Sequence, residues 1–327
     1  MKAAHYSSKG PARDVLIVGE EPDPTPKPGE VVVRIAHSGV NPSDVKSRAG
    51  VTSPAMEFPR VIPHSDGAGV IAAVGEGVSK QRIGERVWTI NGQWQRPFGT
   101  AAEMIALPES QIAPLPLDLS TETGASLGIP LLTAWYAVHA CAGLLGKTVL
   151  VYGATGAVGS YATQLAALSG ARVIGVAGSK EKCDRALQLG AEWAINRNEE
   201  DVTASVREIT AGKRVDAIIE VDAAANASKY GDLLKFGGDV IIYGSGAGLI
   251  EVPFRSMIVG FVNLRFFIVY NLPLPLRKAA IDVLTPLLER GSLQHPQVEI
   301  FPLSEIAKAH ERVEAGANAK IIVDTRG

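Results

Sequence analysis

The stretch Thr148–Leu168, TVLVYGATGAVGSYATQLAAL, decides the fold. Its first five residues, Thr148–Tyr152, are apolar and largely β-branched, which predicts a buried parallel strand. The glycine-rich turn Gly153–Gly159 follows, and an apolar helical segment rich in Ala and Leu then runs to a stop at Ser169-Gly170. Strand, glycine turn and helix in this order are typical of the unit that opens a dinucleotide-binding sheet.

The glycine turn indicates a ligand that carries phosphates. Glycines let the backbone turn tightly and approach a pyrophosphate, and the free N–H groups at the start of the helix bind it. The spacing departs from G-x-G-x-x-G, because Ala154 stands at the first glycine and Gly153 comes one residue earlier. The alternative is a turn that packs a helix on a sheet and holds no ligand. We expect the cofactor to contact Gly153, Ala154, Thr155, Gly156, Ala157, Val158 and Gly159.

Length and composition bound the class of protein. A chain of 327 residues predicts about two domains, and 46% hydrophobic with 20% charged residues suits a globular protein. The net charge of -2 gives no footprint for nucleic acid or anionic membrane. Cys141 and Cys183 lack metal-ligand spacing, which favours two reduced thiols. The first residues lack a signal-peptide stretch, and the apolar segment Met257–Leu276 is too interrupted to span a bilayer, so we expect a cytoplasmic enzyme.

The chain changes character near Ser120. Before it, short strands at close spacing predict a barrel-like β domain, in which Asp66–Gly69 forms a glycine-rich turn between strands. After it, strands alternate with helices, which predicts a doubly wound parallel sheet. The terminal strand Lys320–Asp324 lies outside this repeat, so we expect it to return to the β domain. The predicted domains are residues 1–122, 123–271 and 272–327, with the active site in the cleft between the β domain and the parallel sheet.

Six ordered segments carry a family resemblance. They are SGVNPSDVKSRAG (38–50), PHSDGAGVIAAVGEGV (63–78), IGERVW (83–88), GTAAEMIALPE (99–109), LLTAWYAV (131–138) and the segment that begins VYGATGAVG at Val151. Together they resemble the medium-chain dehydrogenase/reductases, and within them the zinc-free, NADPH-dependent quinone oxidoreductases of the zeta-crystallin-like branch. The resemblance implies an α/β fold, with a Rossmann domain and a GroES-like β-barrel substrate domain. It also implies a homodimer or homotetramer. The apolar run Met257–Tyr270 is a candidate subunit contact, and core packing of the sixth strand is the alternative.

The resemblance to the zinc-free branch rests on the replacement of the residues that bind zinc in other members. Zinc-containing members of this superfamily carry a cysteine where this chain has Asn41, and a His-Glu pair where it has Ser65-Asp66. Asparagine and serine are poor zinc ligands, since zinc is bound by thiolate, imidazole or carboxylate. We therefore expect no metal; a relict pair of His64 and Asp66 is the alternative.

The end of the second strand of the repeat bears on cofactor choice. An NAD-preferring site places an acidic residue there for the ribose 2′-hydroxyl, and Ala177–Lys182 does not do so at the strand end. Gly178, Ser179 and Lys182, with Arg197 after the third strand, suit a 2′-phosphate through charge-assisted hydrogen bonds. We predict NADPH over NADH; the alternative for Lys182 and Arg197 is ordinary surface charge.

The remaining site residues are implied by the resemblance. Asn41 corresponds to a residue beside the nicotinamide and substrate, where its amide can donate to the carbonyl oxygen that gains charge; an Asn-Pro turn is the alternative. Thr133 lies under the nicotinamide ring or packs inside its helix. Tyr243, Gly244 and Ser245 pass the nicotinamide ribose, and Lys320 is assigned to the cofactor site.

Three further side chains are candidates near the substrate. Lys46 replaces a tyrosine common in relatives, so its role as substrate contact or acid does not transfer directly. Arg48 matches the family and borders the pocket or lies on the surface. His64 is an alternative proton donor or a structural residue, and water is another source of the proton.

Without zinc no Lewis acid polarises a simple ketone, so the acceptor must already be electron-poor. The predicted function is hydride transfer from NADPH to a quinone or an α,β-unsaturated carbonyl, with the cofactor supplying the chemistry. The alternatives are an enoyl-thioester reductase and a non-catalytic NADPH-binding protein of the crystallin or sensor kind.

Overall fold

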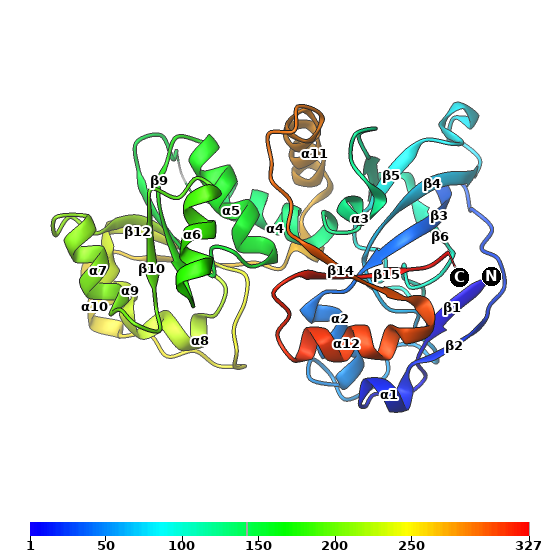
Figure 1. Ribbon diagram of the computed structural model, residues 1–327, viewed down its shortest axis with the longest axis horizontal. Helices are drawn as coiled ribbons and strands as arrows, with labels where there is room; N and C mark the ends of the chain where they lie inside the picture. Colours follow the sequence, from blue (N-terminus) through cyan, green and yellow to red (C-terminus); the bar gives the residue numbers. More distant parts are fainter. Residues whose placement is uncertain (142, 327) are drawn as a thin grey trace. The chain divides into compact units, whose positions relative to one another are not determined.

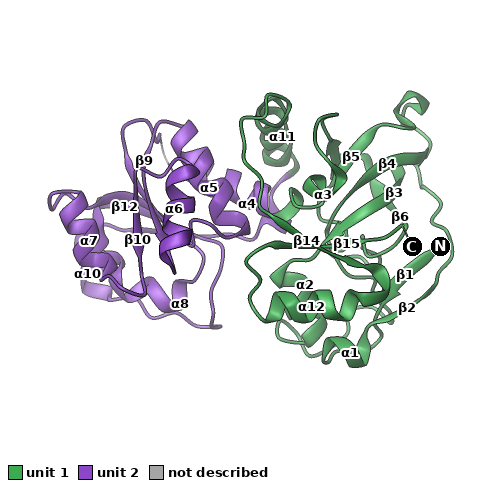
Figure 2. Ribbon diagram, viewed as in Figure 1, with its two compact units in different colours: residues 1–129, 274–327 green, residues 130–273 purple. Residues whose placement is uncertain are grey.

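The computed structural model describes residues 1–141 and 143–326. Contacts divide the chain into two compact units (Figures 1 and 2): unit 1 is residues 1–129 with 274–327, and unit 2 is residues 130–273. Among the described residues no helix is both long and apolar enough to cross a membrane.

Unit 2 is a parallel sheet of six strands in the order β10-β9-β8-β11-β12-β13. The first three strands, β8, β9 and β10, follow one another toward one edge of the sheet, and β11, β12 and β13 follow one another toward the other edge. This is the arrangement of dinucleotide-binding sheets. The elements are α4 (Gly128–Ala140, which begins at the edge of unit 1), β8 (Thr148–Tyr152), α5 (Ala157–Leu168), β9 (Arg172–Ala177), α6 (Lys180–Gln188), β10 (Trp193–Asn196), α7 (Val202–Ile209), β11 (Val215–Glu220), α8 (Ala223–Asn226), η3 (Ala227–Lys229), α9 (Tyr230–Leu233), β12 (Leu234–Ile242), α10 (Phe254–Gly260), β13 (Asn263–Phe266) and η4 (Val269–Asn271).

The core of unit 2 explains why these segments are strands. Leu150, Ile174, Ile218 and Val240 come from four neighbouring strands, and each is fully buried. A sheet covered on both faces requires apolar side chains in both directions, and this is the pattern from which the strands were predicted. The predicted doubly wound fold is confirmed.

Unit 1 is mainly an antiparallel sheet in the order β14-β15-β3-β4-β5-β7, with β6 also paired to β3. Its elements are β1 (Lys2–His5), α1 (Ala12–Val15), β2 (Ile17–Glu20), β3 (Glu30–Gly39), α2 (Pro42–Ala49), β4 (Asp66–Val74), η1 (Lys80–Arg82), β5 (Arg86–Thr89), β6 (Met104–Pro108), η2 (Glu109–Gln111), β7 (Ile112–Pro114), α3 (Thr121–Gly124), α11 (Leu274–Glu289), β14 (Val298–Pro302), η5 (Leu303–Glu305), α12 (Ile306–Glu314) and β15 (Lys320–Asp324). The terminal strand β15 pairs with β3, for example Ile322 with Gly39. The end of the chain therefore completes the sheet that its beginning starts.

Two local predictions are wrong. Asp66–Gly69 is not a turn but the start of β4, where Gly69 pairs with Ile35 of β3. A Cβ at Gly69 would lie 1.8 Å from the Arg34 carbonyl oxygen, so this glycine permits close strand approach rather than a bend. The segment 227–234, whose spacing predicts one helix, is divided between η3 and α9, and Leu234 already belongs to β12.

One predicted helix agrees in place but not at its ends. The segment 127–142, whose spacing predicts a helix, forms α4 over Gly128–Ala140, and Ala142 lies outside the described residues.

Candidate functional site

The glycine turn of unit 2 holds the start of α5 against the end of β8. Gly153 has φ +65°, and the Gly156 N–H donates to its carbonyl oxygen at 2.9 Å. A Cβ at Gly159 would lie 2.0 Å from that same oxygen, so only glycine lets the helix start here. Ala154, at the departure from the usual spacing, is fully buried and donates its N–H to the Val176 carbonyl oxygen. Gly156, the N-cap of α5, is exposed, so the first N–H groups of this helix open toward solvent.

The end of β9 places two predicted cofactor residues together. Ser179 is the N-cap of α6, and its Oγ accepts a hydrogen bond from the Lys182 backbone N–H at 3.3 Å. A Cβ at Gly178 would lie 3.6 Å from Nε of Arg197, so the guanidinium of Arg197 flanks the strand end. Arg197 and Lys182 are exposed. Of the two cations, Arg197 is the one whose charged group is placed beside Gly178.

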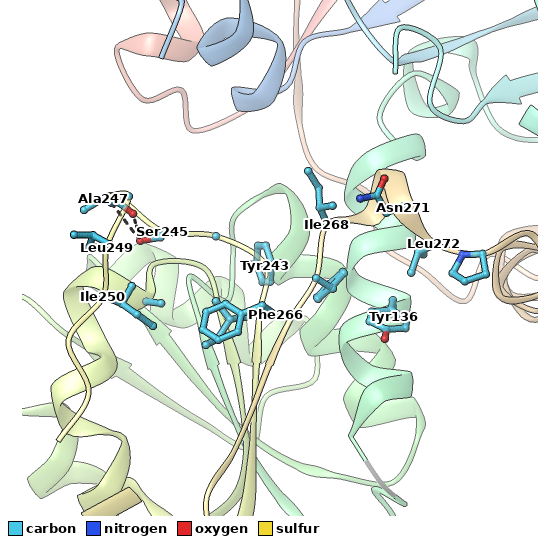
Figure 3. A pocket seen from close by; sticks show the side chains of 16 residues that line it. Tyr136, Tyr243, Ser245, Ala247, Leu249, Ile250, Phe266, Ile268, Asn271 and Leu272 are labelled. Atoms are coloured by element: carbon cyan, nitrogen blue, oxygen red, sulfur yellow. Dashed lines mark hydrogen bonds between the residues drawn. The ribbon is translucent and has the colours of Figure 1, made fainter. Parts of the chain in front are cut away.

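A cavity of about 860 Å³ lies within unit 2 (Figure 3). It opens beyond the carboxyl ends of β12 and β13, at the edge of the sheet where α/β proteins bind ligands. Three predicted residues line the cavity: Tyr243, Gly244 and Ser245. A fourth, Thr133, is buried in α4, one helical turn before the lining residue Tyr136. Its walls are Tyr136, Ala223, Ile242, Tyr243, Gly244, Ser245, Ala247, Gly248, Leu249, Ile250, Phe266, Phe267, Ile268, Asn271, Leu272 and Pro273.

The cavity wall contains aromatic residues that the sequence prediction missed. Phe267 packs against Tyr136, with ring centroids 4.6 Å apart, and lies 6.4 Å from the Tyr243 ring. Burial raises the pKa of the Tyr243 hydroxyl, so it stays neutral at physiological pH. The sequence signal that could have located Phe267 was its position directly after β13. The carboxyl ends of parallel strands meet at one edge of the sheet, where ligands bind.

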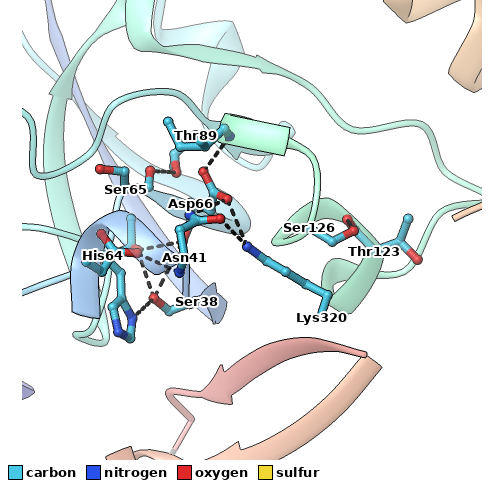
Figure 4. A network of polar contacts seen from close by, with 12 residues as sticks. Ser38, Asn41, His64, Ser65, Asp66, Thr89, Thr123, Ser126 and Lys320 are labelled. Atoms are coloured by element: carbon cyan, nitrogen blue, oxygen red, sulfur yellow. Dashed lines mark hydrogen bonds and ion pairs between the residues drawn. The ribbon is translucent and has the colours of Figure 1, made fainter. Parts of the chain in front are cut away.

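In unit 1, Asn41 lies in a buried polar cluster (Figure 4). Its Nδ2 donates to Asp66 Oδ2 at 2.8 Å, and Lys320 Nζ donates to its Oδ1 at 2.6 Å. Lys320 Nζ also lies 3.2 Å from Asp66 Oδ2, and Asp66 Oδ1 accepts from the Ile129 N–H at 2.7 Å. The structure thus brings two predicted residues, Asn41 and Lys320, into direct contact, and both also contact Asp66, which was predicted only as part of a metal pair.

Asn41 also starts a helix. It is the N-cap of α2, with Pro42 in the first turn, and its backbone N–H donates to Asp44 Oδ2 at 2.8 Å. Burial raises the pKa of Asp44 to about 7, against the lowering effect of the Asn41 hydrogen bonds. The Asn-Pro pair is therefore a helix start rather than a simple turn.

The other two candidates near the substrate, Lys46 and Arg48, differ in their exposure. Lys46 is exposed on α2. Arg48 is fully buried, donating to the Gly10 carbonyl oxygen and pairing with Glu314, so its surface alternative is wrong.

His64 belongs to a second buried network in unit 1. Its φ is +77°, its Nδ1 lies 2.8 Å from Ser38 Oγ, and its Nε2 lies 2.8 Å from Nε2 of His310 on α12. Burial lowers the pKa of both imidazoles. The two ring nitrogens of His64 are both engaged, which favours its structural interpretation.

The donor set of unit 1 does not suit zinc. At the positions where zinc-containing relatives have ligands, Asn41 and Asp66 are hydrogen-bonded to each other and to Lys320. Within residues 1–141 and 143–326, no group of three or more His, Cys, Asp or Glu side chains is arranged to hold a metal ion.

Comparison with known proteins identifies relatives over most of the chain. Residues 27–117 match the alcohol dehydrogenase GroES-like domain, and residues 157–285 match the zinc-binding dehydrogenase domain. The quinone oxidoreductase of Sus scrofa is 33% identical over 303 residues, covering 92% of this chain and 90% of that protein.

Solved structures share the whole fold. One, described as an NAD-dependent alcohol dehydrogenase, is 31% identical with a TM-score of 0.86, and covers 99% of both chains. A mycobacterial protein in complex with NADPH is 25% identical with a TM-score of 0.86, also over 99% of both chains. The neighbours therefore include both cofactor types, and the choice must be argued from this chain's own residues.

Proposed function

Because this chain belongs to the quinone oxidoreductases of the medium-chain dehydrogenase/reductase family, we propose that it transfers a hydride from NADPH to a quinone or another α,β-unsaturated carbonyl compound. The family makes it an oxidoreductase that acts on a small molecule. The identity of the cofactor and of the acceptor is the part that we propose here.

The residues of unit 2 fit a dinucleotide. The exposed start of α5 offers backbone N–H groups to a pyrophosphate, with Gly159 packed so closely on Gly153 that the helix begins at the strand end. The aromatic and apolar cavity beyond β12 and β13 suits a nicotinamide ring and its ribose. Bound NADPH supplies the hydride, while the protein binds, orients and excludes water. The glycine turn at the end of β8 is the observation that carries this proposal.

NADPH rather than NADH is favoured by the charge at the end of β9. No carboxylate occupies the strand end, where one would bind the 2′-hydroxyl of NADH. The Arg197 guanidinium flanks Gly178, and Ser179 has a hydroxyl hydrogen left to donate, since its Oγ acts as acceptor in the α6 cap. These groups suit a phosphate dianion.

The acceptor is proposed from the donor set of unit 1. Asn41 offers an amide and not a zinc-ligating thiolate, so a substrate carbonyl meets a hydrogen-bond donor there and not a Lewis acid. A neutral donor stabilises less charge than a metal ion, which favours acceptors that are electron-poor on their own. The Asn41 amide donates hydrogen bonds but does not give up a proton, so the proposed source of the product proton is water.

The test is a screen of NADPH oxidation. Purified protein is assayed with 1,2-naphthoquinone, simple enones, crotonyl thioesters and aldehydes, each with NADPH and with NADH. Turnover with quinones or enones supports the proposal, and turnover with the thioester alone supports the enoyl-thioester reductase. NADPH binding without turnover of any acceptor indicates the non-catalytic alternative.

We also propose that two copies associate through the edge of the parallel sheet. Five apolar side chains of β12, of α10 and of the residue that follows α10 are exposed, and we call them the edge patch: Phe236, Phe254, Ile258, Val259 and Phe261. The rings of Phe236 and Phe261 are stacked, with centroids 5.8 Å apart, yet these residues are 78% and 67% exposed. A second copy is the occupant we propose, because an unpaired strand edge is complementary to itself about a two-fold axis.

A further inference from the structure

This inference rests on the proposed function and concerns how Asn41 is held. Asn41 lies where β3 gives way to α2, and its side chain is buried between one cation and one anion (Figure 4). Lys320 Nζ donates to its Oδ1 at 2.6 Å, and its Nδ2 donates to Asp66 Oδ2 at 2.8 Å. Lys320 comes 279 residues after Asn41 in the chain, and the pairing of β15 with β3 brings them together.

Hydrogen-bond chemistry fixes which way the Asn41 amide points. An ammonium group can only donate and an ionised carboxylate can only accept. The oxygen of the amide must therefore face Lys320 and its nitrogen must face Asp66, so the usual ambiguity of amide orientation does not arise here. Asn41 Nδ2 carries two hydrogens, and Asp66 is the acceptor recorded for one of them within the described residues. The second hydrogen is available to a ligand.

The same arrangement makes that hydrogen a better donor. The Lys320 and Asp66 side chains are 3% and 0% exposed, so their charges act with little screening by water. The cation at the amide oxygen draws electron density away from the amide nitrogen and so strengthens its N–H groups as donors, while the anion at the other hydrogen fixes the orientation of the amide. Asp66 keeps its own position because its other oxygen accepts from the Ile129 N–H.

We propose that Lys320 and Asp66 are positioning residues that orient Asn41 so that its second Nδ2–H donates to the carbonyl oxygen of the acceptor. When the acceptor takes up the hydride at carbon, the electron pair moves through its conjugated bonds onto this oxygen. The Asn41 N–H stabilises the oxyanion, and water then provides the proton. Lys320 acts through Asn41 and touches neither the acceptor nor the reacting carbon.

A double-mutant cycle tests whether Lys320 acts through Asn41. The variants are Lys320→Met, Asn41→Ala and the two combined, assayed with NADPH and the best acceptor of the screen. Each single variant is expected to lower kcat about tenfold or more while KM for NADPH stays within about threefold. The combined variant is expected to be no slower than Asn41→Ala, because the orienting group has nothing left to orient. Losses that multiply would show that Lys320 acts independently, which overturns the proposal.

Two further variants separate orientation from folding. Lys320→Met leaves the Asp66 carboxylate buried and unpaired, so Lys320→Met with Asp66→Asn removes both charges and keeps the fold testable. This pair is expected to lower kcat as Lys320→Met does; wild-type kcat in a folded protein would contradict the role. Lys235→Met is the matched control, since it removes a lysine–aspartate pair, with Asp216 in unit 2, and is expected to leave kcat unchanged.

An activity-independent measurement distinguishes failure of this inference from failure of the proposed function. The Asn41 side-chain amide is identified in a ¹H–¹⁵N spectrum as the pair of peaks lost in Asn41→Ala. The orientation predicts that both peaks shift in Lys320→Met but not in Lys235→Met. Unchanged peaks in Lys320→Met overturn the positioning role even if the enzyme reduces quinones. Shifted peaks in a protein that consumes no NADPH support the orientation of Asn41 and refute the proposed function instead.

Discussion

Arg197 is the residue that we expect to separate NADPH from NADH. Its guanidinium flanks the end of β9, and each charge-assisted hydrogen bond to a 2′-phosphate contributes about 1.5–3 kcal/mol. Arg197→Ala should therefore lower kcat/KM for NADPH about tenfold or more and leave the value for NADH nearly unchanged. Steady-state kinetics with both cofactors measure this.

Arg172→Ala serves as the control for Arg197. Arg172 is also an exposed arginine, but it is the first residue of β9, at the opposite end of the strand from Gly178, and it pairs with Glu192. Its loss should change neither constant. Equal losses for NADPH and NADH in Arg197→Ala would remove the assignment of the 2′-phosphate site.

His310 should make unit 1 sensitive to acid. Burial, aided by the nearby Arg48 charge, lowers the pKa of His310 to about 3 in the folded protein, against 6.5 for the unfolded chain. Between these values the unfolded state binds more protons, so this stabilisation is complete above pH 6.5 and is lost as pH falls toward 3. His310→Gln keeps a partner for His64 without titrating, so the free energy of unfolding should depend less steeply on pH, by up to about 1.4 kcal/mol per pH unit.

Asp44 contributes to the same pH range with the opposite sign. Its pKa is raised to about 7 in the folded state, so its stabilisation is complete below pH 3.8 and disappears as pH rises through 7. The prediction for His310 is therefore the difference between wild type and variant, measured by denaturant unfolding from pH 4 to pH 7. Parallel curves for the two proteins would show that His310 does not carry the effect.

At the scale of secondary-structure elements, we expect NADPH binding to depend on how α5 packs against β8. Since a Cβ at Gly159 would meet the Gly153 carbonyl oxygen at 2.0 Å, Gly159→Ala must displace the start of the helix. We expect the Kd for NADPH to rise about tenfold or more, because the N–H groups no longer converge on one pyrophosphate. Fluorescence titration measures the Kd.

Gly19→Ala is the matched control for that substitution. A Cβ at Gly19 meets only His5, at 3.9 Å, which is ordinary contact. Its Kd should equal that of wild type. Wild-type affinity in Gly159→Ala would mean that the phosphates bind elsewhere.

Several elements of unit 2 were predictable because they carry a local signal of their own. The bounds of β8 agree residue for residue with the prediction, since buried parallel strands are continuous apolar runs. The start of β4 was not predictable in this way: Asp66–Gly69 has turn composition, and only its pairing with β3 makes it a strand. The Asn-Pro pair, which was given only as an alternative turn, is the start of α2, with Asn41 as the N-cap and Pro42 in the first turn.

At the scale of the whole molecule, the edge patch bears on assembly. Charges on an apolar surface that a second copy covers would be buried without partners. Val259→Glu combined with Phe261→Glu should therefore convert an associated protein into monomers, as measured by size-exclusion chromatography with light scattering. Leu117→Glu, at a residue 85% exposed in unit 1, should leave the mass unchanged. A wild-type protein that is monomeric at all concentrations would refute the proposed contact.

The candidate site includes long-range contacts that the local sequence does not indicate. The glycine turn and the strand ends are local, so the start of α5 after Gly153–Gly156 and the N-cap Ser179 could be predicted from neighbouring residues. The contact of Lys320 with Asn41 and Asp66 depends on β15 returning to β3, and nothing in the local pattern of Lys320 indicates its partners. The aromatic wall of the cavity was not predictable either, because it brings together residues of α4 and of the segment after β13, which are far apart in the sequence.

The central claim is that a hydride passes from NADPH to an electron-poor acceptor without a metal ion. The most direct measurement is a rapid-mixing experiment in which chelator-treated protein, preloaded with NADPH, is mixed with 1,2-naphthoquinone while the nicotinamide absorbance is followed. We predict that one equivalent of NADPH is consumed per site at a rate that neither chelation nor added zinc changes. Consumption that stops on chelation and returns with zinc would contradict the claim.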